Sequence, residues 1–89
     1  MARISTGEQG FAEITPNAAT ADMLLELGMM YCSGREVMQD YVTAHKWFNL
    51  AALTGSEDAR SYRRELAVEM TPAQVAEAQR QARAWLTLH

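Results

Sequence analysis

Residues 27–59 read LGMMYCSGREVMQDYVTAHKWFNLAALTGSEDA and predict two helices joined by a short turn. Gly34 fits the position just after the first helix, because glycine adopts the left-handed cap without steric cost. Asp40 fits the N-cap of the second helix, where its carboxylate accepts a hydrogen bond from a backbone N–H. Gly55 then ends the second helix, and Ser56 begins a third one in the same way.

The two predicted helices carry small residues where their backbones would approach each other. Gly28 lies on the first helix, and we expect the second helix to come close to it near Ala44 or Ala51. Large side chains then fill the seam around these positions. The small residues are Gly28, Ala44, Ala51 and Ala52, the large ones are Leu27, Tyr31, Trp47 and Phe48, and Tyr41 shares the apolar face of the second helix.

This pattern resembles the signature of the Sel-one-like repeat, a relative of the tetratricopeptide repeat (TPR). The signature has a second glycine in the turn, where this chain has Glu36, and an alanine one turn before the leucine, where it has Met23. The resemblance covers the middle third of the chain and implies a short bacterial interaction scaffold. The matching residues are Leu27, Gly28, Tyr31, Gly34, Val37, Asp40, Ala44, Trp47, Ala51, Ala52, Gly55 and Ala59.

Two further helices are expected after the quoted stretch. The third extends from Glu57 to about Met70, with Ala59, Tyr62 and Leu66 on its apolar stripe. Thr71 and Gln74 then form a capping box, and Pro72 takes the first position of the fourth helix. The apolar residues of the fourth helix are Val75, Ala78, Ala82, Trp85 and Leu86.

A short motif is repeated in the two halves of the chain. The motif from Ala44 to Phe48 recurs 38 residues later from Ala82 to Leu86, which is near the roughly 34–47 residues of helical-hairpin repeats. Arg63 and Arg64 occupy the places of Leu27 and Gly28, so helices three and four are expected to pack less closely than helices one and two. The predicted fold is all-α, with two antiparallel helical hairpins (four helices) forming a short TPR-like α-solenoid whose second repeat is degenerate.

Repeat 1 spans about residues 20–55 and the degenerate capping repeat about 56–87, within a repeat domain of residues 16–89. Residues 1–15 read either as a mobile tail or as an arm whose Phe11 and Ile14 dock on a helix. The first helix begins either at Thr15-Pro16 or at Thr20.

Composition restricts the class of protein. The 89 residues are enough for one domain, and the net charge of −3 argues against general nucleic-acid binding. No apolar run approaches the roughly 20 residues that span a bilayer, and the first residues do not resemble a secretory signal. A single cysteine, Cys32, cannot form an internal disulfide. We therefore expect a cytoplasmic protein without a membrane or nucleic-acid partner.

No residue pattern predicts catalysis, a cofactor or a metal ion. The chain has no glycine-rich phosphate loop and no cluster of cysteine and histidine at metal-binding spacing. His45 has Phe48 and Asn49 at helical spacing, so it is interpreted as a solvated surface residue. Trp47 and Trp85 are each expected to be mostly buried in the core of their own hairpin. The chain is therefore not expected to be an enzyme.

The functional hypothesis is a non-catalytic module or adaptor that binds a protein partner through a helical groove. The alternative is a small regulatory subunit or inhibitor of one enzyme. An open helical face also predicts self-association, as a homo-oligomer, or a partner that covers it. Candidate partner-binding residues are Glu26 and Met30 on the first helix and Arg60, Arg63 and Arg64 on the third.

The basic strip of the third helix has two interpretations. It is either a solvated face tied by ion pairs such as Glu57 with Arg60, or a docking patch for an acidic segment. Arg60 is better explained as part of a solubilising cap, whereas Arg63 and Arg64 are expected to face a groove lined by the first and third helices. The methionines of the first helix are likewise either core residues or part of an adaptable groove.

Overall fold

A computed structural model describes residues 20–88, in which four α-helices follow one another and no strand is present. The helices are α2 (Ala21–Ser33), α3 (Tyr41–Thr54), α4 (Glu57–Ala67) and α5 (Pro72–Leu88). The all-α prediction is therefore confirmed for this part of the chain. The predicted tail of residues 1–15, the Thr15-Pro16 start and the docking of Phe11 and Ile14 all fall outside the described residues.

Each helix begins at the cap that its sequence predicts. Thr20 accepts a hydrogen bond from the backbone N–H of Met23 at 3.1 Å, and Asp40 accepts one from Thr43 at the same distance. Ser56 caps α4 in the same way. The reciprocal bonds between Thr71 and Gln74 complete the predicted capping box before α5.

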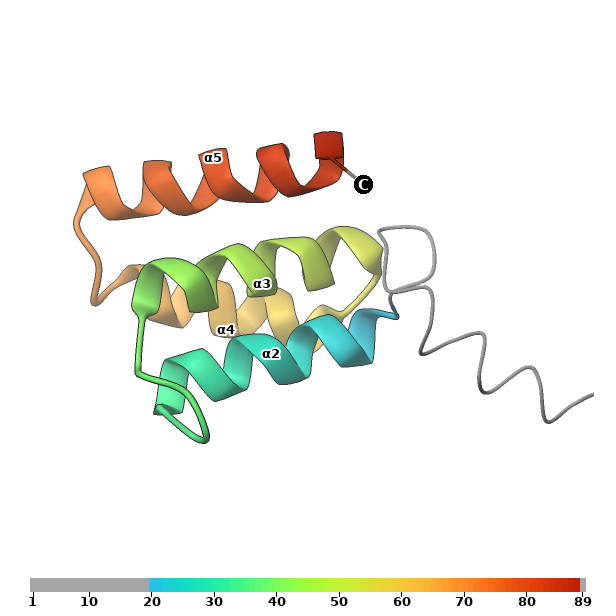
Figure 1. The fold of residues 1–89 in the computed structure, drawn as a ribbon, viewed down its shortest axis with the longest axis horizontal. Helices are drawn as coiled ribbons and strands as arrows, with labels where there is room; N and C mark the ends of the chain where they lie inside the picture. The colour runs from blue at the N-terminus through green and yellow to red at the C-terminus, as the bar shows by residue number, and fades with distance from the viewer. Residues whose placement is uncertain (1–19, 89) are drawn as a thin grey trace, which may run out of the picture.

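The helix α3 is the element against which the other three helices pack. In Figure 1, α5 lies along one side of α3 and α2 lies antiparallel along the other, with α4 behind them. Because α3 is covered from several directions, it supplies much of the buried core. Its buried apolar residues are Ala44, Phe48, Leu50, Ala51 and Ala52, joined by Leu24, Ala59, Leu66, Met70, Ala78 and Ala82 from the other helices and the turn before α5.

The first hairpin is held together where α2 and α3 meet at Gly28. A Cβ atom at this position would lie 2.4 Å from two atoms of the Phe48 ring, which is far inside van der Waals contact. Phe48 is only 1% exposed and therefore has little room to move away. Gly28 is thus a helix-contact residue as predicted, but the side chain that fills the space is Phe48 and not Ala44 or Ala51.

The second pair of helices does not pack like the first. Both α4 and α5 pack extensively on α3, but they make no comparable contact with each other. Arg63 and Arg64 of α4 line a pocket together with Val75 and Gln79 of α5. The predicted looser packing of this pair is confirmed, and α4 and α5 remain separated over α3.

The two tryptophans connect α3 to α5. Trp47 and Trp85 are partly buried and meet edge to face, with ring centroids 5.6 Å apart. This contact joins the two predicted hairpins, whereas the sequence predicted that each tryptophan serves the core of its own hairpin. Edge-to-face pairs of this kind are favoured by the charge distribution of the rings.

Gly28→Ala should lower the free energy of unfolding by about 1–3 kcal/mol, because the new methyl group collides with the buried Phe48 ring. The intrinsic helix preference of alanine acts in the opposite direction, so a loss of stability would be due to packing alone. Ser61→Ala on the exposed face of α4 is the control. Thermal melts of both variants provide the measurement, and an unchanged midpoint for Gly28→Ala would contradict the contact.

The turn between α2 and α3 contains a non-glycine residue with a left-handed backbone. Glu36 has φ 66° and is the one residue other than glycine with a positive φ among those the structure describes. Such a conformation costs a residue with a Cβ atom roughly 1–2 kcal/mol. The turn therefore holds Glu36 in a backbone conformation that glycine adopts at lower cost.

Glu36→Gly should raise the free energy of unfolding by up to about 1 kcal/mol, since relief of the left-handed strain exceeds the entropy that glycine adds to the unfolded chain. Met38→Gly is the matched control, because Met38 is exposed in the same turn without a positive φ and should only lose stability. Urea unfolding of the two variants tests this. Equal destabilisation by both would show that the turn stores no strain at Glu36.

Candidate interaction groove

Two adjoining pockets lie between α4 and α5, with α3 beneath them. Their volumes are about 400 Å³ and about 160 Å³. Asn49, Arg63 and Gln79 line both pockets, so the two form one continuous depression, which we name the α4–α5 groove. The first pocket is completed by His45, Arg64, Ala67 and Val75, and the second by Leu53, Ala82, Arg83 and Leu86.

The floor of the groove is a stripe of residues on α3. His45, Asn49 and Leu53 are spaced four residues apart, which places them on one face of the helix. That stripe changes from polar to apolar along the helix. The groove therefore has a polar end near His45 and Arg64 and an apolar end near Leu53 and Leu86.

A chain of hydrogen bonds fixes the polar groups on the floor. Arg63 donates from Nη1 to Oδ1 of Asn49 at 2.9 Å, and Nδ2 of Asn49 lies 3.3 Å from Nδ1 of His45. Because an amide nitrogen can only donate, Nδ1 of His45 accepts and the ring proton is on Nε2. Asn49 thus orients both the histidine and the arginine.

His45 is 2% exposed, so the prediction of a solvated surface histidine is wrong. The packing of α4 and α5 over α3 covers it, which helical spacing alone did not reveal. Burial, and then the positive charge of Arg63, lower the pKa of His45 from its ordinary value of 6.5. His45 is therefore a neutral part of the groove near neutral pH.

Three arginines of the groove have no carboxylate partner among residues 20–88. The ion pairs of this part of the chain join Arg35 to Glu26, Arg60 to Glu57 and Arg80 to Glu77. Arg63, Arg64 and Arg83 belong to none of them, although all three line the groove. The groove therefore carries positive charge that the described part of the protein does not neutralise.

The candidate residues from the sequence do not all meet at one place. Arg63 and Arg64 line the groove, as expected. Apart from α4, the residues of its lining come from α3 and α5, whereas the sequence predicted that they come from α2. Arg60 lies outside both lining sets and pairs with Glu57 at 3.9 Å, in agreement with its interpretation as part of a solvated cap.

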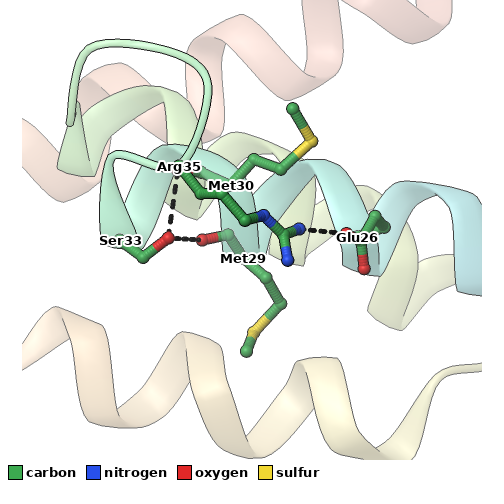
Figure 2. A network of polar contacts seen from close by, with 5 residues as sticks. All are labelled: Glu26, Met29, Met30, Ser33 and Arg35. Carbon is green, nitrogen blue, oxygen red and sulfur yellow. Dashed lines mark hydrogen bonds and ion pairs between the residues drawn. The ribbon is translucent and has the colours of Figure 1, made fainter.

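Glu26 and Met30 lie on α2, away from the groove. Figure 2 shows Arg35 reaching back from the turn to pair with Glu26, while Met29 and Met30 point to opposite sides of the helix. The Ser33 hydroxyl donates to the carbonyl of Met29 at 2.9 Å. Met29 packs against the buried core, which supports the core interpretation for that methionine. The negative charge of Glu26 is already paired.

Residues 20–88 contain no group of three histidine, cysteine or acidic side chains arranged to hold a metal ion. Cys32 is partly buried, and burial raises the pKa of its thiol. Within the same range, each helix is too short or too polar to cross a lipid bilayer. Comparison of the chain with protein-family models, curated proteins and solved structures finds no match in any of the three.

Sequence reasoning missed most of the groove beyond its two arginines. Gln79, Arg83 and Leu86 belong to it only because α5 lies over α3. One signal was available: His45 and Asn49 place two polar residues four apart on a helix most of whose other residues are apolar. Such a pair on a buried helix indicates a polar contact with another element.

Stability should fall as the pH drops below about 6.5, because His45 binds a proton more readily in the unfolded chain than in the fold. The stabilisation is complete above that value and declines as the pH approaches the lowered pKa of the folded state. Glu77 acts in a separate window, since Arg80 and Gln81 lower its pKa from 4.5 to about 2. Urea unfolding at about pH 7.5 and about pH 5 isolates the histidine.

His45→Gln is the matching variant, because its amide oxygen can still accept from Asn49 without titrating. The difference in unfolding free energy between the two pH values should shrink in this variant. An equal difference in wild type and variant would assign the pH dependence to another group.

Proposed function

We propose that this protein is a non-catalytic interaction module that binds an acidic segment of a protein partner in the α4–α5 groove. The observation that carries the proposal is the set of arginines, Arg63, Arg64 and Arg83, that line the groove without a carboxylate partner in residues 20–88. Guanidinium groups bind carboxylates with two parallel hydrogen bonds, which gives both strength and geometry.

The hydrogen bond from Arg63 to Asn49 supports this function. It holds one guanidinium in place before a ligand arrives, so less side-chain entropy is lost on binding. Arg64 and Arg83 are exposed and remain accessible to a partner. The positive charge of the groove also contrasts with the net charge of −3 of the whole chain.

We further propose that the chain is a short Sel-one-like solenoid whose second repeat is a degenerate cap. Three features support the assignment: the close contact of Gly28 with Phe48, the glycine caps after α2 and α3, and the left-handed Glu36 at the position of a signature glycine. A reducing cytoplasm and a bacterial source are part of the same proposal.

Replacing Arg64 and Arg83 together with Glu should weaken capture of the native partner at least tenfold. Loss of a charge-assisted hydrogen bond costs about 1.5–3 kcal/mol, and tenfold in affinity corresponds to about 1.4 kcal/mol. Both side chains are exposed, so the melting midpoint should stay near that of wild type. Affinity capture from the source cells, followed by calorimetry with the captured protein, measures the effect.

Arg60→Glu is the control, since it makes one charge reversal of the same kind on α4 but outside the groove. Its effect on capture should be small at moderate salt. Capture that survives the double replacement, or that is lost equally with Arg60→Glu, would contradict the groove as the binding site.

A further inference from the structure

We propose that the segment bound in the α4–α5 groove is a short extended peptide with acidic side chains toward both ends and an apolar side chain seated against Leu53 and Leu86. This inference rests on the proposed function and adds the chemistry of the partner. It follows from the different character of the two ends of the groove and from its length.

The polar end is built to hold a carboxylate. His45 and Asn49 are both at least nine-tenths buried there, and Arg63 and Arg64 face the same pocket of about 400 Å³. The described residues place no acidic side chain in the lining of that pocket. A carboxylate in this position neutralises charge that is partly removed from water, where an ion pair gains more than at an open surface.

The apolar end exposes side chains that the fold does not cover. Leu53 is 71% exposed and Leu86 is 42% exposed, and both line the pocket beside Ala82. Leu86 corresponds to Phe48 in the repeated motif. Phe48 is only 1% exposed, because Gly28 of α2 and Tyr62 of α4 pack against it. Nothing in residues 20–88 covers Leu86 in the same way. An apolar side chain of a partner removes this surface from water.

Charge is present at both ends of the groove. Arg83 lines the apolar pocket, whereas Arg64 lines the polar one. Because the two arginines line different pockets, a single terminal carboxylate is not expected to pair with both. Complementarity therefore favours a segment with at least two acidic side chains over a free carboxyl terminus, and a mixed segment over a purely acidic one.

The length of the groove sets the length of the segment. From His45 to Leu53 the floor follows eight residues of helix, which at about 1.5 Å each is about 12 Å. An extended peptide covers about 3.3 Å per residue, so about four residues fill the floor. The acidic and apolar side chains of the ligand are therefore within a few residues of each other.

Fluorescence anisotropy with labelled synthetic peptides tests the proposal on the full chain. One peptide carries Glu-Glu-Leu-Glu, a second replaces the leucine with glutamate, and a third replaces every glutamate with glutamine, each between glycine–serine flanks. The mixed peptide should bind about tenfold more tightly than the all-glutamate peptide, and the glutamine peptide should not bind. A tenfold ratio is the gain expected from burying about one apolar side chain.

Leu53→Ser should remove the preference for the mixed peptide while leaving the affinity for the all-glutamate peptide unchanged. Leu88→Ser is the control, because Leu88 is exposed on α5 outside the groove and the preference should persist. Both leucines lie on the surface, so neither change should affect folding.

Two results separate this inference from the proposed function. Equal affinity for the mixed and all-glutamate peptides would overturn the apolar site but leave acidic recognition by the arginines intact. Absence of binding by both peptides, together with native capture that survives the change of Arg64 and Arg83 to Glu, would overturn both. If light scattering shows a dimer, and the change of Arg64 and Arg83 to Glu makes it monomeric, the groove binds a second copy of this chain. That result would overturn the proposal of a separate protein partner.

Discussion

The ring of Phe48 is the contact on which the arrangement of the helices depends. It fills the space that Gly28 leaves open on α2, and it also stacks on Tyr62 of α4 with ring centroids 5.6 Å apart. One buried side chain on α3 therefore positions two other helices. Because protein interiors are close-packed, a change of one methyl group at Gly28 is expected to disturb the whole assembly.

The second pair of helices lacks a close contact of this kind. Helices α4 and α5 pack on α3 and make no comparable contact with each other, and Arg63 and Arg64 of α4 line the space between them. The fold is completed through other contacts, notably between Trp47 and Trp85. The separation of α4 and α5 leaves the groove open, and Arg63 and Arg64 supply part of its positive charge, on which the proposed recognition of an acidic segment rests.

The start of each helix could be predicted from local chemistry, whereas the third helix was predicted to extend to about Met70 and ends at Ala67. Thr20, Asp40, Ser56 and Thr71 act as caps within three residues of their partners, and such bonds are encoded in adjacent sequence. The site could be predicted only in part. Arg63 and Arg64 were identified from their departure from the repeat pattern, whereas His45 was placed in solvent and Arg83 was not predicted to line a groove.

The sequence by itself determined the number, order and caps of the helices in residues 20–88, and the glycine at the seam of the first hairpin. These features depend on interactions between residues close in the chain or on a repeated spacing. The tertiary structure alone decided that α5 lies beside α3, which buries His45, pairs the tryptophans and brings Arg83 and Leu86 to the groove. The reason is physical: burial of a helix face depends on which distant element covers it, and helical periodicity gives the face but not its partner.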